Sequence, residues 1–291
     1  MNDNKTSKNS IVAKFAVPIS FLILFFLAAN FTDCDLVTFW KRRNHLTDLV
    51  VDMIPPDFSY IQKILLPLFY TIQMSVTGTV LGTFFALVLS PFGAANLGFP
   101  AVIRRILRIV IQILRSFPAL ILALTATFLF GLGTFAGTFA ITLYTFAIMT
   151  KLTYEDASAA DVKAYQALRA MGVSKYVAYI HGILPEIIPG FLTNALYLLE
   201  TNVRHSSILG YVGAGGIGLL LNEKISWLEY DKVGTILLML FLTVCVIEYF
   251  SRYLAALIRK ERTIKKEQAR LLLLFLAALF LICTFTLSLP D

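Results

Sequence analysis

The amino-acid sequence predicts an all-α, polytopic membrane protein with about six or seven transmembrane helices. Of its 291 residues, 58% are hydrophobic and 15% are charged, whereas about 25% of an average soluble domain is charged. The mean hydropathy is +0.76. The apolar residues also come in blocks long enough for a bilayer, which a helix of about 20 residues crosses. This composition excludes a disordered chain and leaves too few polar side chains to cover a soluble enzyme.

The apolar blocks define the predicted spans. In order, they cover residues 16–31, 66–90, 119–131, 139–152 with a start near 134, 190–207, 233–258 and 271–289. The first block follows Lys5, Lys8 and Lys14 without a good small-residue cleavage pattern, so we interpret it as an uncleaved helix. In the second block Gly78 and Gly82 lie four residues apart, and such a small-residue face favours close packing against another helix.

An amphipathic segment leads into the third span. Its polar residues recur at helical spacing and form one stripe: Arg104, Arg105, Arg108, Gln112 and Arg115. We expect this helix to enter from the cytoplasmic interface, where long arginine side chains reach lipid phosphates. Pro118 is expected to kink the chain because it lacks an amide hydrogen. The glycines that follow, Gly131, Gly133 and Gly137, predict a tight outer turn.

The distribution of lysine and arginine predicts the orientation. If the amino terminus is cytoplasmic, the cytoplasmic segments are 1–15, 91–105, 153–189 and 259–270, and acidic residues offset the basic ones mainly outside. The cluster Lys41–Arg43 is the exception. We expect the basic cluster 259–270 to bind anionic lipid headgroups rather than nucleic acid, because it lies between two spans without interleaved aromatic residues.

The long polar segment after the fourth span, Thr153–Pro185, is predicted to be a helix–turn–helix outside the bilayer. One apolar stripe at helical spacing comprises Ala160, Ala164, Ala167, Leu168 and Met171. Gly172 suits the left-handed turn at a helix end. Ser174 suits the N-cap of a second helix, which runs through His181 and ends at Pro185. Such a segment is either an ordinary cytoplasmic loop or an amphipathic element that docks in a groove of a soluble partner.

Two stretches resemble the permeases of bacterial ABC importers. Gln166-Ala167-Leu168, Gly172 and Leu184-Pro185 have the spacing of the EAA loop, from which Gln166, Leu168 and Gly182 depart in residue type. The second stretch resembles the phosphonate-type permeases and comprises Leu196-Tyr197, Glu200, Asn202-Val203-Arg204, Ser206-Ser207, Leu209-Gly210 and residues 212–218. The resemblance covers about residues 60–260. It implies a type I permease core over residues 61–260, which contains a coupling loop at 153–189. Residues 1–60 would then form a cytoplasmic tail, a first transmembrane helix and an external segment. Residues 261–291 would form a basic linker and an additional transmembrane helix.

The resemblance also implies a function and partners. We expect the transmembrane subunit of an ATP-driven, binding-protein-dependent importer of phosphonate or a related phosphorus oxyanion in the bacterial cytoplasmic membrane. The implied assembly is a homodimer with cytoplasmic ATPase subunits docked on the coupling loop and an external binding protein. Because the sequence has no Gly-x-x-x-x-Gly-Lys-Ser/Thr, ATP and Mg are expected to be used by the partner, and this chain is no enzyme. The alternatives are a methionine-type amino-acid importer permease and an ATPase-independent secondary transporter.

Polar residues of the fifth span are the candidates for contact with a substrate. Glu200 and Arg204 lie four apart and therefore face the same side of a helix. They form either a structural ion pair or part of a path on which Arg204 meets the anion, because a guanidinium offers a planar fork of donors. The further candidates for this path are Asn202, His205, Ser206 and Ser207.

A glycine-rich segment follows the fifth span. It contains Gly210, Gly213, Gly215, Gly216 and Gly218. Glycine permits close backbone approach and positive φ, so the segment is predicted to be an outer gate or a tight dimer contact, with a flexible loop as the alternative. The three cysteines are widely spaced, and we expect this chain to bind no metal or cofactor.

Overall fold

The computed structural model describes residues 16, 18–28, 31 and 40–260, and the structural statements below concern these residues. The chain divides into two units, Met1–Ile54 and Pro55–Asp291. In the first unit, the helix Pro18–Ala28 lies within the first predicted span, and α3 covers Arg43–Asp52. The seventh predicted span and most of the basic cluster before it lie outside the described residues.

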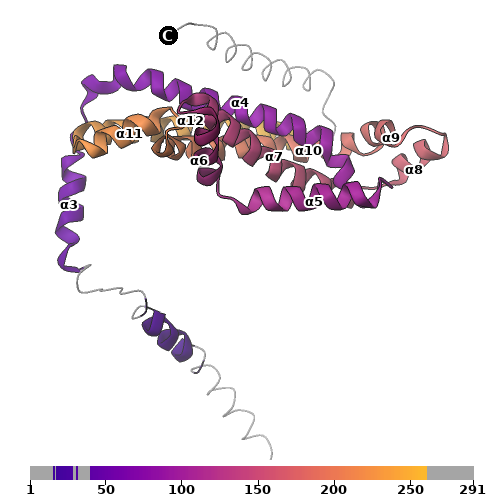
Figure 1. Ribbon diagram of the computed structural model, residues 1–291, viewed down its shortest axis with the longest axis horizontal. Helices are drawn as coiled ribbons and strands as arrows, with labels where there is room; N and C mark the ends of the chain where they lie inside the picture. The colour runs from indigo at the N-terminus through magenta and orange to yellow at the C-terminus, as the bar shows by residue number, and fades with distance from the viewer. Residues whose placement is uncertain (1–15, 17, 29–30, 32–39, 261–291) are drawn as a thin grey trace, which may run out of the picture. The chain divides into compact units, whose positions relative to one another are not determined.

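The second unit is built from α-helices (Figure 1). Its elements are η1 (Phe58–Tyr60), α4 (Ile61–Gly93), α5 (Ala101–Ser116), α6 (Ala119–Phe130), α7 (Thr134–Ala159), α8 (Lys163–Ala170), α9 (Lys175–Gly182), α10 (Leu184–Leu209), η2 (Gly210–Val212), α11 (Ile217–Ser226) and α12 (Tyr230–Lys260). The described part of the chain contains no β-strand. Three of its helices, α4, α7 and α12, are long and apolar enough to cross a membrane, or up to five spans if α5–α6 and α9–α10 each count as one. The predicted all-α membrane fold is confirmed.

The pair α4 and α7 forms the centre of the bundle. Gly78 and Gly82 let the two helices approach closely, as predicted. A Cβ atom on Gly78 would lie 2.6 Å from Cγ2 of Ile141, and one on Gly82 would lie 2.7 Å from Cβ of Thr145. A larger residue at either position would therefore push α4 and α7 apart.

Two helices reach further into the polar segment than predicted. α7 continues to Ala159, well past Leu152, because residues such as Thr153 and Ala157 are buried against neighbouring elements despite the polar composition around them. The first seven residues of the predicted helix–turn–helix, 153–159, therefore belong to α7. The remainder forms the two short helices α8 and α9.

α10 also begins before the predicted start of the fifth span. It starts at Leu184, and Pro185 lies in its first turn. Proline is tolerated there because the N–H groups of the first turn have no acceptor within the helix. Pro189 lies inside the helix. The preceding helix α9 ends at Gly182 rather than at Pro185, and its axis meets that of α10 at 69°.

The chain turns sharply between α5 and α6. The two helices are bent by 95° at the break that contains Pro118, which confirms the predicted kink. At a rise of about 1.5 Å per residue, α6 alone is roughly 18 Å long and too short to cross a hydrocarbon core of about 30 Å. Gly131 and Gly133 form the following turn with φ of +86° and +140°. Gly137 was wrongly assigned to that turn; it lies inside α7, where a Cβ atom would meet the backbone oxygen of Ala214.

The arginine stripe of α5 differs in part from the expectation. Arg108 Nε donates to the backbone oxygen of Gly93 at 3.0 Å, and its guanidinium lies 5.0 Å from the centre of the Tyr154 ring. Arg104 donates to the backbone oxygen of Ala95 at 3.4 Å. These two side chains therefore bind carbonyl groups at the C-terminal end of α4 and just beyond it, where a helix attracts positive charge. The sequence alone had placed them only at lipid phosphates.

Candidate functional site

The α8–α9 pair presents small apolar side chains outward. Ala164 and Ala167 are exposed on one side of α8, and Met171, just beyond its end, is 71% exposed. Leu168 was placed on the same stripe from the sequence, but it is partly buried and packs against an inner cluster that contains Tyr165. The outward face is therefore narrower than predicted and consists mainly of alanine.

Tyr165 ties α8 to the loop between α4 and α5. Its side chain is buried, and its hydroxyl donates to the backbone oxygen of Leu97 at 2.7 Å. Burial raises the pKa of the Tyr165 phenol, so the group remains a neutral donor. Lys175 at the start of α9 donates to the backbone oxygen of Gly98 in the same loop. The outward face of α8 thus rests on an inner side that is hydrogen-bonded to α4–α5.

The same loop is also bonded to the end of α7. Asn96 Nδ2 donates to the backbone oxygen of Ala157 at 3.0 Å. The backbone N–H of Ala95 donates to Ser158 Oγ at 3.2 Å. The loop that leads into α5 is therefore hydrogen-bonded to α7, α8 and α9.

Both predicted turn residues adopt the expected conformations. Gly172 has φ of +85°, and Ser174 Oγ accepts a hydrogen bond from the backbone N–H of Val177 at 3.4 Å. Ala160 does not belong to α8, because it is the C-cap of α7.

The remaining residues predicted for ATPase docking divide into two groups. Gln166 and Pro185 are exposed, as docking requires. Leu184 is partly buried and packs against the same inner cluster as Leu168.

Glu200 and Arg204 form the predicted ion pair on α10. The glutamate side chain is 11% exposed, whereas the arginine side chain is 51% exposed. Arg204 therefore keeps part of its guanidinium open while its charge is balanced within one helix turn, which reduces the cost of placing it in a membrane span.

Asn202 and Ser206 point into the bundle. Asn202 Nδ2 donates to Thr79 Oγ1 of α4 and to Thr145 Oγ1 of α7, both at 2.8 Å. Ser206 Oγ donates to the backbone oxygen of Thr71 at 3.2 Å. These groups connect α10 to its neighbours. Ser207 Oγ donates to the backbone oxygen of Arg204 at 2.6 Å, within α10 itself.

His205 lies at a cleft of about 290 Å³. The lining residues are Pro118, Ala119, Leu120, Tyr144, His205, Ile208 and Leu209, from α6, α7 and α10. The rings of His205 and Tyr144 meet edge to face, with centroids 5.2 Å apart. His205 Nδ1 is enclosed without a hydrogen-bond partner among the described residues. Of the six predicted path residues, His205 and Arg204 are the two that reach open space.

The glycine-rich segment seats α11 against α4. The backbone N–H of Ile217 donates to Thr71 Oγ1 at 2.8 Å. A Cβ atom on Gly216, whose φ is +72°, would lie 2.6 Å from that hydroxyl oxygen. Gly213 and Gly215 also have positive φ, of +81° and +76°.

Gly210 and Gly218 lie against each other across the same segment. A Cβ atom on Gly218 would overlap the backbone oxygen of Ser207, and one on Gly210 would overlap the backbone of Gly218 and Leu219. Close packing within one chain therefore explains why glycine is needed at these positions. The role of the glycines as an outer gate stays a prediction.

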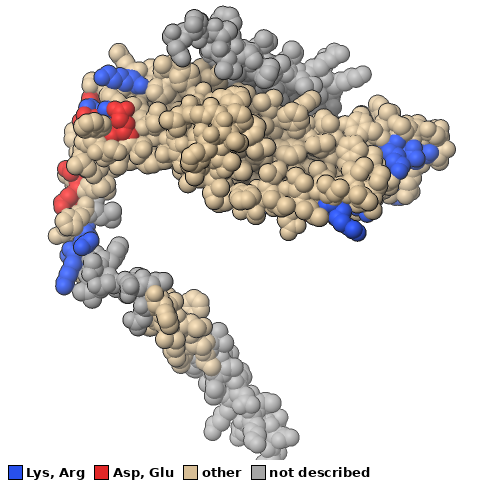
Figure 2. All heavy atoms as spheres, viewed as in Figure 1, with Lys and Arg blue, Asp and Glu red and all other residues tan. Residues whose placement is uncertain are grey.

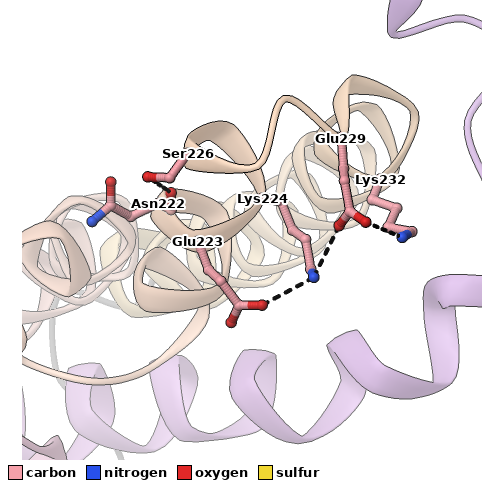
Figure 3. A network of polar contacts seen from close by, with 6 residues as sticks. All are labelled: Asn222, Glu223, Lys224, Ser226, Glu229 and Lys232. Atoms are coloured by element: carbon pink, nitrogen blue, oxygen red, sulfur yellow. Dashed lines mark hydrogen bonds and ion pairs between the residues drawn. The ribbon is translucent and has the colours of Figure 1, made fainter.

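Charged side chains gather where α11 meets α12 (Figures 2 and 3). Lys224 Nζ lies 3.0 Å from carboxylate oxygens of both Glu223 and Glu229, and Lys232 Nζ lies 2.7 Å from Glu229. Hydrogen bonds from Lys232 and Lys224 lower the pKa of the Glu229 carboxyl. Hydrogen bonds to Glu223 and Glu229 raise the pKa of Lys224. Within the described residues, no group of three or more His, Cys, Asp or Glu could hold a metal ion.

Sequence reasoning missed three residues that organise this site. Tyr165, Tyr144 and Thr71 were not predicted to matter. Tyr165 was detectable in principle, since a tyrosine ring tends to be buried while its hydroxyl finds a hydrogen-bond partner. Nothing in the local sequence marks Thr71 or Tyr144, whose partners lie 146 and about 60 residues away.

Comparison with known proteins agrees with this architecture. Residues 78–264 match the family described as "Binding-protein-dependent transport system inner membrane component". The phosphite transport system permease protein PtxC of Stutzerimonas stutzeri is 31% identical over 217 residues, 75% of this chain and 79% of that protein. The phosphate-import permease protein PhnE of Mycolicibacterium smegmatis is 31% identical over 203 residues, 69% of this chain and 38% of that protein.

A solved structure has the same fold. An inward-facing form of the MetNI methionine ABC transporter contains a chain that superposes with a TM-score of 0.61 at 20% sequence identity, covering 69% of this chain and 99% of that one. Together with the family match, this agreement identifies a multi-pass membrane permease subunit. The chain therefore belongs to the family of binding-protein-dependent transport system inner membrane components.

Proposed function

We propose that this permease carries a phosphorus oxyanion, such as phosphite or a phosphonate, into the cytoplasm. The observation that carries the proposal is the 31% identity over 75% of the chain with a phosphite transport permease. The methionine transporter shares the fold at 20% identity, which gives no support for a common substrate.

Arg204 is the group that we assign to the anion. Its side chain is 51% exposed and lies on the same helix as His205, which borders the cleft. A guanidinium binds a tetrahedral oxyanion through parallel N–H donors. Glu200 balances the charge of Arg204 when no ligand is present, and so prevents the anion from being held too tightly for release.

The proposed energy source is a partner ATPase that docks on α8 and α9. The support is the outward face of Ala164, Ala167 and Met171, which has no partner among the described residues and is held rigidly from behind by Tyr165. Two copies of the chain would give two such docking faces, related by a twofold axis. ATP and Mg would then be bound by the ATPase, and the amino terminus of this chain would lie in the cytoplasm, consistent with its basic inner segments.

The test is uptake into vesicles that contain the permease, its ATPase and its binding protein. We expect ATP-dependent uptake of labelled phosphite or phosphonate that excess methionine does not compete. Arg204→Gln should lower the uptake rate about 10- to 150-fold, because a hydrogen bond to a charged group contributes about 1.5–3 kcal/mol. Arg204→Lys should retain part of the uptake. Methionine uptake that is insensitive to phosphite would refute the substrate assignment. Uptake by the permease without an ATPase would refute the importer mechanism itself.

A further inference from the structure

The turn between α11 and α12 exposes two large apolar side chains. Trp227 is 71% exposed and Leu228 is 68% exposed. Leu228 has φ of +57°, and among the described residues it is the one non-glycine residue with positive φ. A leucine in this conformation is strained, because its Cβ atom crowds the following carbonyl oxygen.

The backbone of this turn is a complete Schellman motif. The N–H of Glu229 donates to the oxygen of Lys224, and the N–H of Leu228 donates to the oxygen of Ile225, both at 3.1 Å. Leu228 occupies the position at which glycine is strongly preferred. A glycine would form the same turn with less strain, since no bond of the turn uses the leucine side chain. The strain and the exposure together indicate that this side chain acts on something outside the chain.

A network of ion pairs lies beside the turn (Figure 3). Glu229 directly follows Leu228 and is bonded to both Lys224 and Lys232. The ammonium groups of these two lysines lie 5.5 and 5.6 Å from the centre of the Tyr60 ring in η1. The network therefore joins α11, α12 and η1, directly beside the two apolar side chains.

The position along α12 indicates what covers them. The span Tyr230–Ile258 begins two residues after Leu228. Its most apolar 18-residue window has a mean hydropathy of 2.2, and 17% of that window is buried. An exposed apolar surface of this length is typical of a helix that crosses a bilayer. If α12 crosses the bilayer, the turn lies at the end of its apolar stretch, where the helix leaves the hydrocarbon. Tryptophan is enriched at this level of the bilayer, and lysine side chains beside it reach the headgroups.

We propose that Trp227 and Leu228 form an interfacial anchor that inserts into the headgroup region of the bilayer. The anchor fixes the C-terminal end of α11, while Thr71 fixes its N-terminal end. α11 is then held at both ends, and the glycine-rich segment before it moves against a stationary helix. This inference requires that α12 spans the membrane, and it does not depend on the substrate.

Tryptophan fluorescence tests the anchor directly. The sequence has two tryptophans, so Trp40→Phe leaves Trp227 as the single emitter in the full-length protein. In phosphatidylcholine–phosphatidylglycerol vesicles, a doxyl group near the headgroup should quench Trp227 about twofold more strongly than one near the middle of the acyl chain. Quenching by aqueous iodide but by neither lipid probe would overturn the proposal. An emission change on addition of the substrate-binding protein, without lipid quenching, would instead assign the turn to protein docking.

Two substitutions of Leu228 separate strain from membrane contact. Leu228→Gly should raise the midpoint of thermal unfolding, because it removes the strain, and should weaken quenching by the shallow lipid probe. Leu228→Ala keeps the strained backbone without the large side chain, so it should weaken the quenching without raising the midpoint. Unchanged quenching in both variants, with both proteins eluting as the parent does in size-exclusion chromatography, would remove Leu228 from the anchor.

Discussion

The two ends of the second unit are held together by different physical means. At the α8–α9 end, the side chains that join the elements are the buried tyrosine hydroxyl of Tyr165 and neighbouring amide and ammonium donors, all bonded to backbone carbonyls. At the α11 end, glycines allow backbone contact, and ion pairs on Lys224 and Glu229 hold the next turn. The buried bond of Tyr165 is neutral and therefore insensitive to salt, whereas the partly exposed ion pairs of the second end are screened. The contacts of the first end should therefore persist at any ionic strength, whereas those of the second end should weaken as the ionic strength rises.

The largest expected effect is at the glycine contact of the α11 end. In Gly218→Ala the new methyl group overlaps the backbone oxygen of Ser207, so α11 must move away from α10. We expect a loss of about 3 kcal/mol in the free energy of unfolding, the upper range for overpacking, measured by thermal unfolding in detergent. The matched control is Gly190→Ala on α10, where the nearest atom is 4.0 Å away. A Gly218→Ala protein as stable as this control would disprove the close contact.

At the α8–α9 end, Gly172 is needed for its positive φ angle and not because a side chain would lack space. No atom lies within 4 Å of a Cβ placed on Gly172, yet φ is +85°. Gly172→Val should cost about 1–2 kcal/mol through this strain and weaken capture of the partner ATPase. Gly172→Asn should retain both properties, because asparagine tolerates left-handed backbone. Equal capture by the two variants would argue against a role for this turn in docking.

Tyr165→Phe tests whether the neutral bond of the first end transmits motion. The ring remains buried and one hydrogen bond to Leu97 is lost, which should cost about 1 kcal/mol equally at low and high salt. In reconstituted vesicles we expect fewer anions transported per ATP hydrolysed, while ATPase capture is unchanged. A parallel fall in transport and hydrolysis would indicate only a smaller folded fraction.

The smallest effect is expected from the ion pairs of the second end. The pKa of Glu229 is lowered in the folded protein. The contribution of Glu229 to the free energy of unfolding is therefore complete above the ordinary pKa of 4.5, and it is lost as the pH falls through the lower pKa of the folded protein. Glu229→Gln should lower the unfolding midpoint slightly at neutral pH and low salt. The difference should vanish in high salt and at acid pH. A difference that persists in high salt would mean that Glu229 acts through packing and not through charge.

The sequence was most informative where the physics is local. Gly172 and Ser174 adopt the predicted turn and cap because both depend on a few neighbouring residues. Glu200 and Arg204 pair because four residues make about one helix turn. The extension of α7 to Ala159 was missed for the opposite reason, since its burial depends on elements that come later in the chain.

The same limit applied to the candidate site. Judged from the sequence alone, Asn202 and Arg204 are equally suited to line a polar path. In the structure, Asn202 is completely buried between two threonines of α4 and α7. A helix period predicts which residues share a face, but which faces meet is decided when the helices pack.

By itself, then, the sequence determined the membrane class, most of the spans, the polar segment after the fourth span and the residues that resemble a transport family. Apolar block length, charge distribution and short-range sterics are properties of neighbouring residues, and they need no knowledge of the fold. Tertiary structure alone decided that Tyr165 bonds to Leu97, that Thr71 seats α11 and that Gly218 lies against Ser207. Tyr165 and Thr71 have partners 68 and 146 residues away, and close packing admits such contacts only after the helices have met.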